Sequence, residues 1–179
     1  MDGHAAVVYR LPSCWLLQQD PDGLGETHGW YAVNLEDQDW GRYRTDLGAG
    51  WEEQGHPDAD GLFWFRQRVA LPASCAKPYV YLYFRACDEE AWVWVDGLPL
   101  GERTVASTGL RPERLWLAPF ALAAGRRLRP GPQHTLAVRV SDISGMGGLY
   151  MPVFVIAADV PLSEEQMTRL VALRNPHEL

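Results

Sequence analysis

The strand-turn-strand pattern of residues 88–101 constrains the fold of this chain more than any other stretch. Alanine or valine alternates with tryptophan over residues 91–95, so both faces of the predicted strand are apolar. The following Asp96 and Gly97 favour a tight hairpin turn, because glycine readily adopts positive φ and aspartate tolerates it. A strand that is apolar on both faces is usually covered on both sides. The pattern therefore predicts an inner strand of a layered β structure.

Other segments of the chain show the short apolar or alternating patterns of β-strands, separated by turn-forming residues. These segments are residues 6–18, 62–71, 78–86, 113–120, 134–141 and 149–157. Between them, residues 27–60 show little periodicity and are expected to form a long irregular excursion. The spacing of strands and turns predicts an all-β sandwich of about eight strands. With 47% hydrophobic residues, the chain can build a substantial core.

The C-terminal segment has a helical pattern instead. Ser163–Gln166 matches a helix-capping box, and apolar residues follow at helical spacing from Met167 onward. Asn175-Pro176 is expected to end this helix. We therefore expect a β-sandwich domain over residues 1–160 and a helical tail over residues 161–179. The helix would dock on the sandwich or on a partner chain.

Composition narrows the class of protein. The net charge of −7 argues against nucleic-acid binding, which needs a basic surface. No apolar run approaches the ~18 residues of a membrane span. The start Met1–His4 leads into no signal peptide, so we expect a cytoplasmic protein, unless an export signal was removed. Cys14, Cys75 and Cys87 are widely spaced and form no CxxC motif, which favours neither a zinc site nor a disulfide framework.

Six short motifs follow one another in order over about residues 15–156. They are Trp15 with Asp20–Gly25 and Gly29-Trp30; Asp39-Trp40; Trp51–Gly55 with Asp60-Gly61 and Trp64–Arg66; Asp88–Gly97 with Gly101; Pro119-Phe120; and Leu136–Asp142 with Gly147–Leu149. Together they resemble the N-terminal sugar-binding domain of glycoside hydrolase family 2, of the β-galactosidase and β-glucuronidase type. The chain departs from the family pattern at Asp96, where asparagine is usual, and at Phe65, where tyrosine is usual.

The resemblance implies a jelly-roll β-sandwich of the galactose-binding-domain-like type. It also implies a non-catalytic carbohydrate-binding module, with a carbohydrate ligand or a glycoside hydrolase as its partner. The family's acid/base and nucleophile glutamates belong to a catalytic barrel that this sequence does not contain. No catalytic residue is therefore carried over, and the chain is not expected to be an enzyme.

Carbohydrate sites combine a flat aromatic ring, which stacks on a sugar, with polar groups that bind its hydroxyls. The candidate ligand-binding residues are the loop aromatics Trp30, Trp40 and Trp51, and the polar residues Arg66, Asp88 and Asp142 near predicted strand ends. Each also has a structural alternative. The tryptophans would anchor the long loop on the sandwich, and Arg66 would pair with a buried carboxylate such as Asp88.

A metal site is a further alternative. Asp20, Asp22 and Glu26 place hard oxygen ligands in a short glycine-containing loop, which suits calcium. The same residues are also ordinary turn formers, and their spacing is not that of an EF-hand. We expect no cofactor, with a structural calcium ion as the less favoured alternative.

Catalytic patterns are weak. Glu52-Glu53, Glu89-Glu90 and Glu164-Glu165 are sequence neighbours, which face opposite ways on a strand and do not flank a sugar. Ser141, Ser144, His134 and Asp142 lie near one another in sequence, but no nucleophile elbow accompanies them. A small hydrolase is therefore ranked last. The main alternative to sugar binding is an interaction module of the same fold, which would bind a partner or form a homodimer through residues 163–174.

Overall fold

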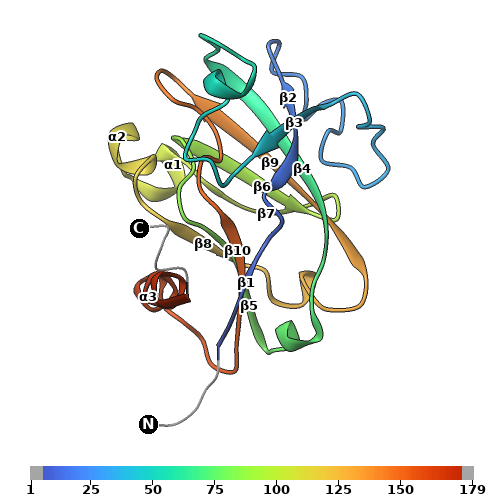
Figure 1. Cartoon of the computed structure of the whole chain (residues 1–179), viewed down its shortest axis with the longest axis vertical. Helices are drawn as coiled ribbons and strands as arrows, with labels where there is room; N and C mark the ends of the chain where they lie inside the picture. Colours follow the sequence, from blue (N-terminus) through green and yellow to red (C-terminus); the bar gives the residue numbers. More distant parts are fainter. Residues whose placement is uncertain (1–5, 175–179) are drawn as a thin grey trace.

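The computed structural model describes residues 6–174, which form an all-β sandwich with a C-terminal helix (Figure 1). One sheet has four strands in the order β1-β10-β5-β8, and the other has six in the order β3-β2-β4-β9-β6-β7. All neighbouring strands are antiparallel. The predicted all-β sandwich is confirmed, with ten strands in the described residues in place of about eight.

The strands are β1 (Val7–Arg10), β2 (Cys14–Gln19), β3 (Gly41–Arg44), β4 (Gly61–Ala70), β5 (Tyr79–Phe84), β6 (Glu90–Val95), β7 (Leu98–Arg103), β8 (Phe120–Ala123), β9 (Gln133–Asp142) and β10 (Val153–Ala158). The helices are α1 (Val105–Thr108), α2 (Pro112–Leu115) and α3 (Glu164–Arg174), with short 3-10 turns η1 (Glu52–Gln54), η2 (Ala73–Cys75) and η3 (Gly125–Arg127). None of the helices in the described part of the chain is both long and apolar enough to cross a membrane.

The core lies between the two sheets and follows the alternation of the sequence. In β4, Phe63 and Phe65 point into the core, whereas Trp64 and Arg66 belong to the opposite face. Phe65 lies opposite Val138 of β9, which is also fully buried. The apolar side chains of the two inner faces therefore form one continuous core.

The hairpin between β6 and β7 forms as the sequence predicts. Asp96 has φ 51° and Gly97 has φ 78°, so both turn residues are left-handed, as a tight hairpin of this type requires. The Asp96 carboxylate accepts a hydrogen bond from Thr135 N at 2.8 Å and lies 2.7 Å from His134 Nδ1. Both of its oxygens are used, which gives a physical reason for aspartate at this turn, since asparagine offers only one oxygen.

A loop covers the outer face of the six-stranded sheet. Trp30 and Tyr31 of this loop pack on Trp64 and Trp94, and the Tyr31 ring stacks on Trp94 with centroids 5.6 Å apart. Trp40 packs against the same cluster. The prediction that both faces of the β6 strand are covered is confirmed. Trp30 and Trp40 therefore lie where the structural alternative predicts, packed on the sandwich as anchors of the loop.

Arg66 holds this loop to the sheet. Its Nε donates to Asp37 Oδ2 at 2.9 Å, and its other nitrogens donate to the carbonyl oxygens of Trp30 and Ala32 at 2.5 and 2.9 Å. Although burial favours the neutral acid, hydrogen bonds from Arg66 and Arg68 hold the pKa of Asp37 below its usual value. The predicted pairing of Arg66 with a buried carboxylate is confirmed. The partner is Asp37 and not Asp88, because the loop brings Asp37 over the middle of β4.

Two segments differ from the sequence prediction. Residues 113–119 are not a strand, because Pro112 starts the short helix α2, as proline does at a first helical position; the strand β8 begins only at Phe120. Arg103 Nη1 then donates to the carbonyl oxygens of Leu115 and Ala118 at 2.9 and 2.7 Å, so side-chain bonds replace a strand ladder there. Within the predicted irregular stretch, Gly41–Arg44 form the edge strand β3 by pairing with β2.

Helix α3 docks on the outer face of the four-stranded sheet. Met167 and Val171 are buried against Tyr83, Phe154 and Ile156. Figure 1 shows α3 and the covering loop on opposite sides of the sandwich. Docking on the sandwich is thus confirmed.

The capping box predicted at the start of α3 is also present. Ser163 N donates to Gln166 Oε1 at 2.8 Å, and Gln166 N donates to Ser163 Oγ at 3.3 Å. The predicted helix end at Asn175-Pro176 lies outside the described residues. The division of the chain at residue 160 stays a prediction.

Replacing Asp37 with alanine should destabilise the protein strongly, because the buried Arg66 guanidinium would lose its carboxylate partner. We expect a loss of about 3–5 kcal/mol in the free energy of unfolding, measured by denaturant unfolding. Asp39→Ala removes an exposed carboxylate from the same loop and is the matched control. Equal stability of the two variants would contradict this role for Asp37.

Replacing Met167 with alanine tests whether α3 belongs to the cooperative unit. The substitution leaves a cavity between the helix and β5–β10, so the free energy of unfolding should fall by about 2–4 kcal/mol. Leu173→Ala, on the exposed face of the same helix, should change it by less than about 0.5 kcal/mol. If Met167→Ala behaves like Leu173→Ala, the helix unfolds separately from the sandwich.

Candidate ligand-binding site

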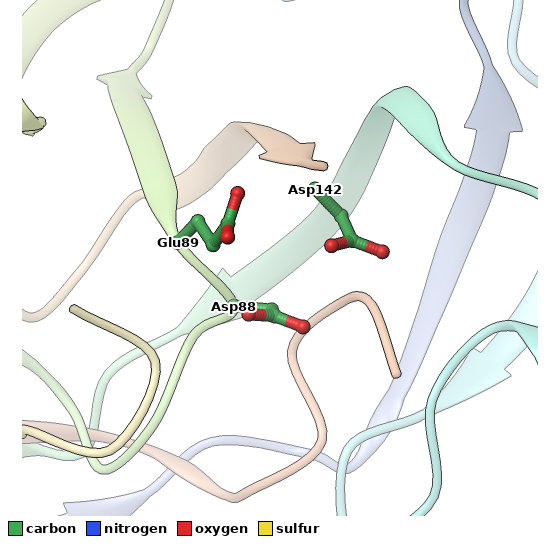
Figure 2. A group of neighbouring side chains, drawn as sticks. All are labelled: Asp88, Glu89 and Asp142. Carbon is green, nitrogen blue, oxygen red and sulfur yellow. The ribbon is translucent and has the colours of Figure 1, made fainter. Parts of the chain in front are cut away.

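Three acidic side chains meet at one end of the six-stranded sheet. Strand β6 pairs with β9 so that Glu90 lies opposite Ser141, which places the residues before β6 beside the end of β9. Asp88 and Glu89 precede β6, and Asp142 ends β9. Figure 2 shows the three carboxylates gathered together, and one ligand oxygen from each lies within 4.8 Å of the others.

Backbone contacts fix two of these carboxylates. Ser144 N donates to Asp142 Oδ1 at 2.9 Å, and Ile143 N donates to Glu89 Oε2 at 3.0 Å. Glu89 has φ 45°, an uncommon backbone conformation for a residue other than glycine. The turn after β9 is therefore tied to the residues before β6, and the acidic group has a defined geometry.

Burial and mutual repulsion shape the electrostatics of this group. Asp142 is 2% exposed and Asp88 is 6% exposed. Burial, together with the charges of Asp142 and Glu89, raises the pKa of Asp88 to about 7. Burial also raises the pKa of Glu89 and of Asp142 above their ordinary values. Within residues 6–174, none of the three carboxylates forms an ion pair with a basic side chain.

A hollow of about 380 Å³ opens beside the acidic group. Its lining residues are Asp88, Glu89, Glu113, Trp116, Ser144, Gly145 and Met146. Trp116 is 39% exposed, and its position is held by Tyr150, whose hydroxyl donates to the Trp116 carbonyl oxygen. The hollow thus combines an accessible aromatic ring with convergent carboxylates and a serine hydroxyl, which is the chemistry of a site for a polar, ring-shaped ligand.

The six sequence-predicted site residues lie in three different places. Asp88 and Asp142 come together in the acidic group. Trp30, Trp40 and Arg66 lie on the outer face of the six-stranded sheet, and Arg66 is 1% exposed. The structure does not bring these two sets together.

Trp51 supports the site from within the core. It is fully buried, and its ring stacks on Phe63 with centroids 4.0 Å apart, so neither ring face is open to a sugar. Its backbone N donates to Gly147 O at 3.0 Å. A Cβ atom at Gly147 would lie 2.2 Å from the Trp51 ring, so only glycine fits there. Trp51 therefore shapes the turn that borders the hollow.

Sequence reasoning missed Trp116 and Glu89. Trp116 lies in the segment that the sequence predicts as a strand, and the sequence pattern shows Glu89 only as the neighbour of Glu90, facing the other way. Glu113 is likewise part of the misassigned segment. The glycines at positions 145, 147 and 148 are a usable signal in the sequence, because they favour an irregular connection soon after Asp142.

In the loop that contains Asp20, the carboxylates of Asp20 and Glu26 have partners within the protein. Asp20 Oδ2 accepts hydrogen bonds from Trp64 Nε1 at 2.9 Å and from Gly25 N at 3.0 Å. Gly25 N also donates to Asp20 Oδ1 at 3.1 Å. Glu26 forms an ion pair with Arg139 at 2.7 Å. The carboxylates of Asp20 and Glu26 thus have donors or an ion-pair partner in the protein, whereas the acidic group of Asp88, Glu89 and Asp142 has few hydrogen-bond donors.

No family model matches the chain, and no curated protein matches it. Among solved structures, the chain is similar to β-glucuronidase from Ruminococcus gnavus in complex with D-glucuronic acid, with TM-score 0.71 and 16% identity over 88% of this chain and 30% of that chain. The complex of the same enzyme with D-glucaro 1,5-lactone gives TM-score 0.71 and 15% identity over the same shares. The chain therefore spans 30% of the length of these structures and shares their fold over that part.

The raised pKa of Asp88 predicts an unusual dependence of stability on pH. Between about pH 4 and pH 7, folded Asp88 keeps a proton that the unfolded chain has released, so stability falls as pH rises through this range. Asp88→Asn should reduce this slope without abolishing it, because the pKa values of Glu89 and Asp142 are also raised. It should raise the free energy of unfolding at pH 8 by up to a few kcal/mol, on the order of the shift itself.

The measurement is denaturant unfolding at pH 5 and pH 8 in EDTA, which keeps cations away from the carboxylates. Asp22→Asn, at an exposed carboxylate, should retain the wild-type slope. A wild-type slope in Asp88→Asn would show that Asp88 does not carry the effect.

Proposed function

We propose that this protein is a non-catalytic carbohydrate-binding module that binds a sugar ring in the hollow beside Asp88. The observation that carries the proposal is the exposed Trp116 ring next to convergent polar groups in a concave surface. An indole face suits the apolar face of a pyranose, and carboxylate and serine oxygens accept hydrogen bonds from its hydroxyls.

The charge of the hollow indicates the class of sugar. Asp88, Glu89 and Glu113 all line it, so it repels an anionic ligand when these carboxylates are ionised. A neutral sugar supplies hydroxyl donors and avoids this repulsion. We therefore propose a neutral carbohydrate, although the similar β-glucuronidase structures are complexes with D-glucuronic acid and D-glucaro 1,5-lactone.

Burial supports the non-catalytic assignment. A glycosidase needs two carboxyl groups that flank the scissile bond in an open cleft. Asp88 and Asp142 are almost completely buried and crowd together at one point. In this proposal they stabilise a bound sugar or shape the hollow, and a catalytic unit such as a glycoside hydrolase acts beside this module.

A second function is favoured by exposed apolar side chains close in sequence to the residues that line the hollow. Met146 lines the hollow itself, and Leu110, Leu117 and Ile143 are exposed in the same two segments of the chain. Exposed apolar side chains that form a contiguous patch are typical of protein contacts. The alternative is therefore an interaction module that uses this end of the sandwich to bind a partner or a second copy of the chain.

Trp116→Ala tests the sugar-binding proposal. Removal of the stacking ring should weaken binding of a neutral glycan by about fivefold or more, since an aromatic contact contributes on the order of 1 kcal/mol. Binding is measured on a glycan array of neutral and uronic-acid sugars and then by calorimetric titration. Tyr79→Ala removes an equally exposed aromatic ring, 40% against 39%, from strand β5 and should bind like the wild type.

The two candidate functions give different results in these experiments. Saturable binding of a neutral glycan that Trp116→Ala loses and Tyr79→Ala keeps supports the carbohydrate-binding module. Absence of glycan binding, combined with concentration-dependent dimerisation in sedimentation that Leu117→Ser weakens, overturns it in favour of the interaction module.

A further inference from the structure

The acidic group holds a polar atom that the protein leaves without a partner. Asp142 is 98% buried, since it is 2% exposed, and within residues 6–174 its Oδ2 has no hydrogen-bond donor. A buried carboxylate oxygen without a donor or cation costs free energy, so such atoms are rare in folded proteins. Asp142 Oδ2 belongs to the same carboxylate that converges with Asp88 and Glu89. A partner for this oxygen would therefore lie at the acidic group formed by Asp88, Glu89 and Asp142.

The charges around this atom call for a cation. Glu52 and Asp60 add their negative charges to those already acting on Asp142. Glu52 itself is fixed in place, because Gly147 N donates to its Oε1 at 3.0 Å. No lysine, arginine or histidine among the described residues pairs with any of these acids. Within the described part of the chain, no ion pair with a basic side chain balances the negative charge of these acids.

We propose that Asp88, Glu89 and Asp142 bind a calcium ion. All three ligands are hard carboxylate oxygens, which Ca²⁺ prefers. Two oxygens on opposite sides of Ca²⁺ are about 4.6–5.2 Å apart, against about 4.0–4.2 Å for Mg²⁺. The ligand oxygens here lie within 4.8 Å of one another, which accommodates the larger ion. The adjoining hollow leaves room for water molecules to complete the coordination shell.

The local fold is suited to hold the ion. Asp142 comes from the end of β9, and Asp88 is tied to the same turn, because its backbone N donates to Gly148 O at 3.0 Å. Glu89 is held by Ile143 N, as described above. All three ligands are therefore positioned by one pair of neighbouring strands and the turn between β9 and β10. The ion would stabilise this turn and the floor of the hollow.

This inference goes beyond the proposed function and does not rest on it. The ion is bound by protein carboxylates alone, so it can be present in a protein that binds no sugar. It is also distinct from the loop of Asp20, Asp22 and Glu26, the calcium candidate suggested by the sequence. The experiment distinguishes the acidic group from the Asp20 loop and requires no sugar.

The test is calorimetric titration of the full chain, stripped with EDTA, with CaCl₂ and separately with MgCl₂. We expect one calcium ion per chain with a dissociation constant below about 10⁻³ M, and at least tenfold weaker binding of magnesium. Asp142→Asn should weaken calcium binding by at least about tenfold, since ligand charge sets the affinity of such sites. Glu89→Gln is the second variant, and it keeps the acceptor for Ile143 N.

Asp22→Asn is the matched control, because it removes an exposed carboxylate from the other candidate loop. It should bind calcium like the wild type, and circular dichroism should show that all variants are folded. Loss of binding in Asp22→Asn with retention in Asp142→Asn and Glu89→Gln would assign the ion to the Asp20 loop and overturn the proposal. Absence of heat from the wild type up to about 10 mM calcium would overturn it as well.

Discussion

Coverage of both faces of the six-stranded sheet is the constraint on which this structure depends. The inner face packs on the four-stranded sheet, and the outer face carries Trp64, Trp94 and the buried Arg66. The loop that follows β2 covers these side chains and supplies Asp37 as the partner of Arg66. A buried guanidinium without its carboxylate is costly, so loop and sheet stabilise each other. The ends of the sheet remain the places where a ligand can approach.

The pairing of β6 with β9 gives one of these ends its chemistry. It places Asp88 and Glu89 beside Asp142, in a position where no basic side chain of the described residues reaches them. The connection from β7 to β8 adds Trp116 at the edge of the same hollow. Carboxylates that lack protein partners can be satisfied by sugar hydroxyls or by a cation. Both proposals therefore rest on the same carboxylate oxygens, which have few partners within the protein.

Much of the fold could be predicted because local patterns agree with tertiary packing. Alternation in β4 and β6 assigned the faces of the strands correctly, and the Asp96-Gly97 turn and the Ser163 capping box formed as expected. The errors came where pairing or capping by distant residues decides the conformation. Gly41–Arg44 is a strand because β2 lies beside it, and residues 113–116 avoid the sheet because Arg103 and Tyr150 bind their carbonyl groups.

The sequence by itself determined the class of fold and the faces of the central strands, and it singled out Asp88 and Asp142 of the acidic group, because periodicity, turn residues and strand ends are local properties. Only the tertiary structure decided which polar groups meet. It placed Arg66 with Asp37 and Trp51 inside the core, and it brought Trp116 to the hollow beside Asp88. Those contacts depend on how a loop crosses the sheet and on the register between strands far apart in the sequence. Local patterns carry no information about either.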